Sequence, residues 1–489
     1  MMTLSTKSTR VRIENFIGGK NEASDSGKTF ETLNPATGEV LGEVALGTAS
    51  DIDRAVAAGR EAFQKGPWAR MTMAERCNII DRIGDLILER REELARAETL
   101  DTGKPLSESL TGDIPRSGQN FKFFASYAAS MGEDCFTSAS DERHVAIREP
   151  LGVCGLITPW NLPLYLATWK IAPCLVMGNS CVLKPAEWTP YTAFLFAEIT
   201  RQAGLPDGVF NVVNGFGPDG AGEALTGHPR VSSISFTGET GTGKAIMANA
   251  ATTLKKVSFE LGGKGANIIF DDADLDTALD TAVRAAYRNQ GQICLAGSRL
   301  FVQKGVYKKV VEALVERVKS IKVGDPLDPS TQMGALISKE HMEKVQSYIE
   351  LGAREGKLLT GGERLQDLGP GNFIAPALFE GLSHDSRFCQ EEIFGPALPV
   401  IPFTSEDEAV EMANDTPYGL SASLWSENVN RCHRVASGIR AGLIWVNCWF
   451  ARDLRTPFGG QKASGIGREG GRYSLEFFSE AKTISYKYR

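Results

Sequence analysis

Four short apolar runs decide the fold, and they are residues 153–157 (VCGLI), 181–183 (CVL), 210–213 (FNVV) and 232–236 (SSISF). Amphipathic stretches typical of helices lie at residues 189–203, between the second and third runs, and at residues 241–251, after the fourth. Strands that alternate with crossover helices predict a parallel sheet with helices on both faces. The sequence therefore indicates an α/β domain in this part of the chain.

Helical patterns also precede and follow these runs. In the first hundred residues, apolar side chains recur at helical spacing. A helix is expected to begin at Ser50 as its N-cap. A second alternating series contains expected helices at residues 306–321, 339–354 and 406–414. This series predicts a second α/β domain. The extended segment 480–488 has no strand partner nearby in sequence, a feature typical of strands that pair with another subunit.

Composition excludes several classes of protein. The 489 residues leave room for about three domains, and 42% hydrophobic with 23% charged residues is close to the average for folded proteins. The net charge is −7 and no basic stripe is present, so we expect no nucleic-acid partner.

Cysteine usage and the N-terminus predict a cytoplasmic protein. The nine cysteines contain no CxxC pair, which favours free thiols in a reducing compartment and no metal site. The N-terminus lacks the apolar stretch of a secretory signal. Residues 151–169 are uncharged, but internal Gly and Pro residues argue against a membrane span.

Two glycine motifs give weak signals. Gly215, Gly217 and Gly220 fit the GxGxxG pattern of a dinucleotide-binding turn, although a simple loop explains them equally well. Residues 238–244 fit most of a phosphate-binding P-loop, but Ala245 lacks the hydroxyl that Mg²⁺ requires, so we do not expect an NTPase.

Four stretches place reactive side chains among small residues: 158–161 (TPWN), 259–263 (FELGG), 289–294 (NQGQIC) and 391–396 (EEIFGP). Together with residues 34–38 (NPATG) and 457–460 (PFGG), they resemble the ordered signature motifs of the NAD(P)-dependent aldehyde dehydrogenase superfamily. The resemblance implies a Rossmann-like cofactor domain and a catalytic domain, both doubly wound parallel sheets, plus a small β oligomerisation element. The implied segments are 1–132 and 148–258 for NAD binding, 259–452 for catalysis, 133–147 and 475–489 for oligomerisation, and 453–474 as a return to the cofactor domain.

Three residues resemble the catalytic groups of that family. Cys294 resembles the nucleophile, whose thiolate adds to an aldehyde carbon. Asn161 resembles the amide that stabilises the resulting oxyanion, and Glu260 resembles the general base for thioester hydrolysis. Apolar neighbours should raise the pKa of Glu260. The alternative interpretations are a buried core thiol, an Asx turn and a salt-bridged carboxylate, and a cysteine esterase is the alternative class of activity.

The same resemblance implies a cofactor site for NAD. Its expected residues are Ile157, Trp160, Lys184, Glu187, Gly217, Phe236, Gly238, Glu392 and Phe394. The carboxylate of Glu187 favours NAD over NADP because it repels a 2′-phosphate. Glu239 stands where many members of the family have a serine that contacts phosphate, which puts that contact in doubt.

Arginine-bearing stretches indicate the substrate class. Arg116, Arg452, Arg455 and Phe458 resemble residues of the muconic semialdehyde dehydrogenase branch, which includes 2-hydroxymuconic and 2-aminomuconic types. Paired arginines there bind the distal carboxylate of an aldehyde acid. Other aldehydes, including carboxymethyl-hydroxymuconic semialdehyde, remain open, and so does a purely structural role for the arginines. The resemblance also implies a homodimer or homotetramer. Because residues 151–169 do not read as a membrane span, we expect no membrane partner.

Overall fold

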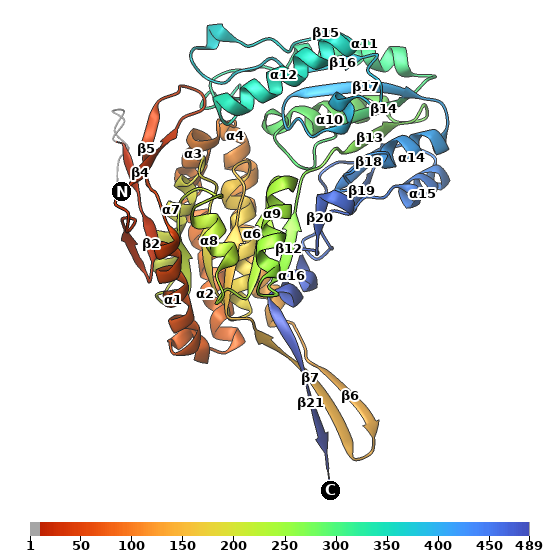
Figure 1. Ribbon diagram of the computed structural model, residues 1–489. Helices are drawn as coiled ribbons and strands as arrows, with labels where there is room; N and C mark the ends of the chain where they lie inside the picture. Colours follow the sequence, from red (N-terminus) through yellow and green to blue (C-terminus); the bar gives the residue numbers. More distant parts are fainter. Residues whose placement is uncertain (1–9, 489) are drawn as a thin grey trace.

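The computed structural model describes residues 10–488, which form four β-sheets and their surrounding helices (Figure 1). The first large sheet has the strand order β20-β12-β11-β8-β9-β10-β2-β3. Its strands are β2 (Asn15–Ile17), β3 (Lys20–Glu22), β8 (Val153–Ile157), β9 (Ser180–Lys184), β10 (Phe210–Val212), β11 (Ser233–Thr237), β12 (Lys256–Glu260) and β20 (Gly465–Ile466). The five strands from β12 to β10 are parallel, so the predicted α/β class is confirmed.

Helices cover both faces of this sheet. The crossover helices are α6 (Pro163–Val176), α7 (Tyr191–Gln202), α8 (Ala221–Gly227) and α9 (Thr240–Ala251). The chain passes from β8 through β9 to β10, and then returns to β11 on the other side of β8. The direction of winding therefore changes between β8 and β11, and the carboxyl ends of strands at such a point form a crevice that binds ligands.

The second large sheet lies in the upper part of Figure 1 and has the order β15-β16-β17-β14-β13-β18-β19. Its strands are β13 (Ala266–Ile269), β14 (Arg299–Gln303), β15 (Lys357–Thr360), β16 (Ala377–Glu380), β17 (Ala397–Phe403), β18 (Ser421–Trp425) and β19 (Leu443–Val446). Among its helices are α10 (Leu275–Tyr287), α11 (Tyr307–Lys319), α12 (Lys339–Glu355), α14 (Glu406–Asn414) and α15 (Val429–Gly438). All neighbouring strands except β15 and β16 run parallel, which confirms the second α/β unit.

A three-stranded antiparallel sheet projects from the body as an arm (Figure 1). It consists of β6 (Asp134–Ala139), β7 (Glu142–Pro150) and β21 (Ser479–Lys487), with β7 in the middle. The C-terminal segment thus has its strand partner within the same chain, where Ser485 pairs with His144. The outer edges of β6 and β21 remain available, and their role in oligomerisation stays a prediction.

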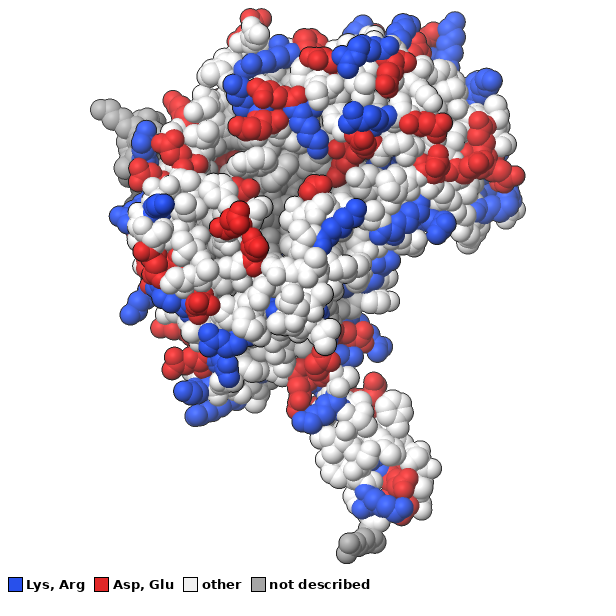
Figure 2. All heavy atoms as spheres, in the orientation of Figure 1, with Lys and Arg blue, Asp and Glu red and all other residues white. Residues whose placement is uncertain are grey.

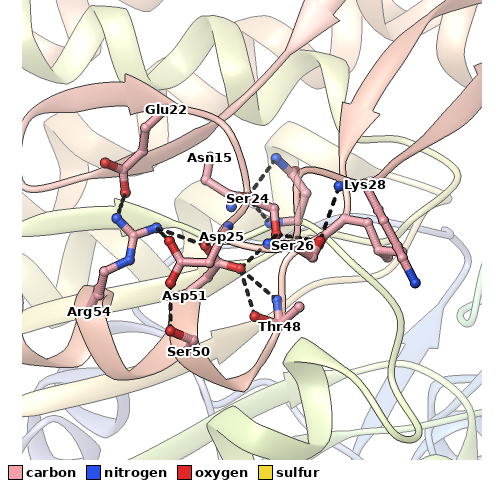
Figure 3. A network of polar contacts seen from close by, with 12 residues as sticks. Asn15, Glu22, Ser24, Asp25, Ser26, Lys28, Thr48, Ser50, Asp51 and Arg54 are labelled. Carbon is pink, nitrogen blue, oxygen red and sulfur yellow. Dashed lines mark hydrogen bonds and ion pairs between the residues drawn. The ribbon is translucent and has the colours of Figure 1, made fainter.

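The N-terminal part wraps the first large sheet. A small sheet contains β1 (Val11–Ile13), β4 (Thr29–Leu33) and β5 (Val40–Ala45), and the long helices are α1 (Ala49–Gln64), α2 (Met73–Glu89), α3 (Arg91–Thr102) and α5 (Ile114–Ala129). The N-cap of α1 is Thr48, so the expectation of Ser50 was wrong. The reason is that Asp51 accepts the backbone N–H of Thr48 at 2.8 Å, while the hydroxyl of Ser50 donates to Asp25 (Figure 3).

Two further expectations can be compared with the structure. The expected boundary between residues 258 and 259 divides β12, which pairs with β11 as far as Glu260, so we propose that the first domain extends to Glu260. The uncharged stretch 151–169 contains β8 and the start of α6. Within residues 10–488, no helix combines the length and the apolar character needed to cross a membrane.

Candidate active site

The nucleophile loop, residues 289–294, lies between α10 and β14 and meets the carboxyl end of β12. Glu260 is the last residue of β12, and the chain then passes through Gly263. A Cβ atom at Gly263 would lie only 2.5 Å from the carbonyl oxygen of Cys294, so glycine is required for this close approach. The sequence therefore folds so that the second and third reactive stretches are in contact.

Asn161 is tied to the same loop by two hydrogen bonds. Its side-chain Nδ2 donates to the carbonyl oxygen of Gln292 at 2.9 Å, and Nδ2 of Asn289 donates to the Asn161 carbonyl at 3.0 Å. Asn289 and Gln290 have left-handed backbones, with φ of 50° and 57°. Such strained backbone conformations persist only where surrounding contacts hold them, and they are common at functional sites. The amide predicted to stabilise an oxyanion is thus fixed beside the loop of the predicted nucleophile.

The surroundings of Cys294 disfavour its thiolate. Burial raises its pKa to about 12, with further contributions from the nearby carboxylates of Glu392 and Glu260. Only the thiolate is strongly nucleophilic. A group that accepts the thiol proton is therefore needed for chemistry at this residue.

Glu260 has the properties expected of such an acceptor. Both carboxylate oxygens are buried and have no hydrogen-bond partner among the described residues. Burial raises the pKa of Glu260 well above its usual value, and the neighbouring carboxylate of Glu469 raises it further. Glu469 itself is held by Lys170, whose Nζ lies 2.6 Å from Glu469 Oε1. Sequence reasoning missed Lys170, because it reaches the site from the middle of α6.

Arg116 and Arg452 converge on one tyrosine. Nη1 of Arg452 donates to the hydroxyl of Tyr165 at 3.2 Å, and the guanidinium of Arg116 lies 6.0 Å from the centre of the Tyr165 ring. Arg452 is also sandwiched between the rings of Trp169 and Phe458, each centred 4.1 Å from its Cζ. Nε of Arg116 and both Nε and Nη2 of Arg452 are buried without a partner in residues 10–488.

Arg455 does not join this pair in the structure, and its place in the substrate site stays a prediction. Its guanidinium forms an ion pair with Asp453 at 2.6 Å, and its side chain is 68% exposed. By contrast, Phe458 is buried in a cluster that also contains Ile293 and Trp449 and that Cys294 contacts. Tyr165 and Trp169 were missed from the sequence, although their spacing of four residues on α6 places them on one helix face.

The expected cofactor residues follow the carboxyl ends of the parallel strands. Their positions are Ile157 at the end of β8 and Trp160 just after it, Lys184 and Glu187 at and after β9, Gly217 between β10 and α8, and Phe236 and Gly238 at and after β11. Nζ of Lys184 lies 3.2 Å from the carboxylate of Glu187, and burial lowers the pKa of this lysine. Figure 2 shows a hollow in the surface between the part that carries α12 and the part that carries α9.

The residue Glu239 caps α9. Its carboxylate accepts the backbone N–H of Thr242 at 3.2 Å, so an acidic group already occupies the positive end of this helix. The sequence identified Glu239 as a departure from the serine that many members of the family have. In the structure, Glu239 serves as the N-cap of α9.

The stretch 391–396 approaches the same region from the second large sheet, just before β17. Oε1 of Glu392 accepts the backbone N–H of Gly263 at 2.8 Å, and burial raises the pKa of Glu392 to about 7. Phe394 has a left-handed backbone, with φ of 59°, and its ring meets Trp160 edge-on at 5.3 Å. Sequence reasoning missed His341 on α12. Its Nε2 lies 2.8 Å from the carbonyl oxygen of Phe394, and its ring packs on Trp160.

The described part of the chain contains no candidate site for a metal ion. Residues 10–488 contain no group of three or more His, Cys, Asp or Glu side chains arranged to hold a metal ion.

The comparisons with known proteins agree with this geometry. The chain is 48% identical over 483 residues to a 2-hydroxymuconic semialdehyde dehydrogenase of Pseudomonas sp. (strain CF600), covering 97% of this chain and 99% of that protein. It is 46% identical to a 2-aminomuconic 6-semialdehyde dehydrogenase of Pseudomonas sp., covering 96% and 97% respectively.

A solved structure, the NAD⁺ complex of an aldehyde dehydrogenase from Bacillus cereus, superposes with a TM-score of 0.96 at 43% identity, covering 98% of this chain and 97% of that one. The sequence signature of the aldehyde dehydrogenase family matches residues 22–484. The predicted resemblance is thus confirmed, and this chain belongs to the aldehyde dehydrogenase family.

Proposed function

We propose that this protein oxidises a carboxylated, unsaturated semialdehyde of the muconic type to the corresponding acid, with NAD as the oxidant. Relatives named 2-hydroxymuconic and 2-aminomuconic semialdehyde dehydrogenases, 48% and 46% identical, support this substrate class. Such aldehydes arise when aromatic rings are cleaved. The proposal therefore places the enzyme in the breakdown of aromatic compounds.

The observation that carries the proposal is the pair Arg116 and Arg452. Two guanidinium groups share Tyr165, and burial lowers the pKa of Arg116, with Arg452 contributing. A buried charge needs polar partners, and Nε of Arg116 and both Nε and Nη2 of Arg452 have no hydrogen-bond partner in residues 10–488. A substrate carboxylate supplies such partners and matches the planar donors of guanidinium. The aldehyde at the other end of such a substrate then extends toward Cys294.

The chemistry of this chain runs in two stages. Glu260 removes the thiol proton of Cys294, and the thiolate adds to the aldehyde carbon to form a thiohemiacetal. The side-chain amide of Asn161 and the backbone N–H of Cys294 hold the oxyanion. Glu260 passes the proton of Cys294 to bulk water before the second stage. After oxidation to a thioester, Glu260 takes a proton from water, and the hydroxide equivalent attacks the thioester carbon. The acid leaves, and the departing thiolate of Cys294 takes the proton from Glu260 and becomes a thiol again.

The strand ends are suited to hold NAD. A Cβ atom at Gly217 would meet nothing within 4 Å, so the space beside this turn is open to a ligand. Glu187 and Lys184 would hold the adenine ribose, while Glu392, Phe394 and Trp160 would hold the nicotinamide end. When bound, NAD accepts the hydride that leaves the thiohemiacetal carbon. Ile157, Phe236 and Gly238 would line the crevice between β8 and β11.

We also propose a homodimer or homotetramer in the cytoplasm. The free edges of β6 and β21 on the projecting arm support assembly through this sheet. The nine cysteines are all free thiols, as expected in a reducing compartment.

The test replaces Arg116 or Arg452 with Met, which keeps much of the side-chain volume but removes the charge. For a semialdehyde with a distal carboxylate, kcat/KM should fall about ten- to a hundredfold, mainly through KM, because a charge-assisted hydrogen bond contributes roughly 1.5–3 kcal/mol. Arg455→Met serves as the matched control and should change kcat/KM little. Equal losses for an acidic aldehyde and a neutral aldehyde of the same length would contradict the proposed substrate class.

A further inference from the structure

A third arginine lies next to the proposed substrate site without belonging to the clamp of Arg116 and Arg452. Arg288 immediately precedes the nucleophile loop, and its side chain is 25% exposed. Its Nε lies 3.4 Å from the carboxylate of Glu108, and its Cζ lies 5.4 Å from the centre of the Phe450 ring. The distance of 3.4 Å between Nε and the carboxylate is long for an ion pair, so Glu108 cancels only part of the positive charge of Arg288.

The neighbours of Arg288 come from the same two segments that carry the clamp. Nη2 of Arg288 lies 3.1 Å from the position of a Cβ atom at Gly112. Gly112 belongs to the π-helical turn η2 (Ser109–Asp113) and precedes Arg116 by four residues, about one helical turn. On the other side, Phe450 precedes Arg452 by two residues and packs against the cluster that Cys294 also contacts. Arg288 therefore bridges the segments of both clamp arginines at the start of the nucleophile loop.

We propose that Arg288 is a specificity-determining residue beside the proposed substrate site, where its charge attracts anionic aldehydes before the clamp binds them. This inference rests on the proposed function and adds a separate step to it. A charge at the mouth of a cleft with low-dielectric walls raises the local concentration of oppositely charged substrates. Electrostatic attraction of this kind weakens as salt concentration rises.

Glu108 sets the strength of this attraction. Burial raises the pKa of Glu108, and the positive charge of Arg288 opposes that rise. When ionised, the carboxylate anchors the guanidinium and also cancels part of its field. Removal of the carboxylate should therefore act in the opposite direction to removal of the arginine.

The experiment compares Arg288→Gln, Arg288→Lys and Glu108→Gln in the full-length enzyme with saturating NAD. At low ionic strength, Arg288→Gln should lower kcat/KM for a carboxylated semialdehyde about three- to tenfold through KM, and added 0.5 M NaCl should remove most of the difference. Arg288→Lys should retain most of the wild-type value because it keeps the charge. Glu108→Gln should raise kcat/KM for the same substrate, while a neutral aldehyde of equal length should respond little to all three changes.

The outcomes separate this inference from the proposed function. A wild-type enzyme without preference for the carboxylated aldehyde contradicts the proposed function. The proposed role of Arg288 is then contradicted as well. A wild-type preference that Arg288→Gln leaves intact overturns only the role of Arg288. The same holds if Arg288→Lys loses as much as Arg288→Gln, or if the loss persists at high salt, because either result indicates a packing role.

Discussion

Two groups of buried charges in this molecule differ in whether the chain supplies their partners. Lys104 is fully buried, and its Nζ lies 2.9 Å from Glu98 and 2.6 Å from Asp113. Lys170 is equally buried and forms its ion pair with Glu469. These cations are compensated within the folded chain, as the cost of removing charges from water requires.

The second group lacks such compensation. The carboxylate oxygens of Glu260 and several guanidinium nitrogens of Arg116 and Arg452 are buried without partners in the described chain. An uncompensated buried polar group destabilises a protein, so its presence needs an explanation. We propose that the compensated charges serve the fold, whereas these uncompensated charges are held ready for substrate and water.

The largest effect expected from this contrast concerns Glu260. Glu260→Gln should lower the rate of thioester hydrolysis about 10²- to 10⁴-fold, because the base is lost while the shape is kept. The wild-type hydrolysis rate should rise with pH as Glu260 ionises through its raised pKa, and the variant should lack this rise. Rapid-mixing measurements of NADH formation and acyl-enzyme lifetime test both points.

A control for this experiment is the first turnover. If hydrolysis limits turnover, a burst of NADH stoichiometric with enzyme should remain in Glu260→Gln, although it forms more slowly if no other group accepts the proton of Cys294. A variant that binds NAD normally but produces no burst at any pH would show that no other group replaces Glu260 as the acceptor of the Cys294 proton. An acyl-enzyme that Glu260→Gln hydrolyses at the wild-type rate would overturn the proposed hydrolytic role.

A compensated charge should behave in the opposite way. Lys104→Met leaves Glu98 and Asp113 buried together and should lower the free energy of unfolding by about 3–5 kcal/mol. Arg452→Met removes an unpaired charge and should leave that free energy within about 1 kcal/mol of wild type, or raise it. Urea denaturation of both variants measures the difference, and equal destabilisation would break the distinction between the two groups.

Much of the fold could be predicted because its signals are local. The runs 153–157 and 232–236 are apolar and bounded by turns, and they form neighbouring strands of one sheet. The helix expected at 406–414 has the same bounds in the structure, since Ser405 supplies an unambiguous N-cap. Cys294, Asn161 and Glu260 could be proposed because their motifs are short and contiguous.

Residues that reach the site across the fold could not be predicted. Lys170 and Glu469 are 299 residues apart, and nothing near either residue signals their ion pair. His341 contacts the carbonyl of Phe394 from α12, which is distant in sequence from the stretch 391–396. Arg455 shows the converse, because its motif resembles the clamp while its neighbour Asp453 pairs with it at the surface, and the sequence does not signal that pair. Local patterns therefore identify the reactive groups, and tertiary contacts decide which of them meet.

The smallest effect we predict concerns Asp51, a buried carboxylate with a full set of donors. It accepts hydrogen bonds from the side chain of Ser24 and the backbone N–H groups of Asp25 and Thr48, and it pairs with Arg54 (Figure 3). Burial alone would raise its pKa, but these donors together hold the pKa of Asp51 below its usual value.

A carboxyl whose pKa is lowered by folding stabilises the protein above its unfolded pKa, and this contribution disappears as pH falls through the folded value. Asp51→Asn should therefore lower the free energy of unfolding by about 1–2 kcal/mol at pH 7, comparable to the loss of a strong helix cap. The difference from wild type should shrink as the pH falls below about 4, where Asp51 in the unfolded chain begins to bind a proton. Denaturation midpoints of both proteins between pH 3 and 7 measure this convergence. A difference that stays constant over that range would mean that the charge of Asp51 contributes nothing, and the compensated group would then owe its stability to packing alone.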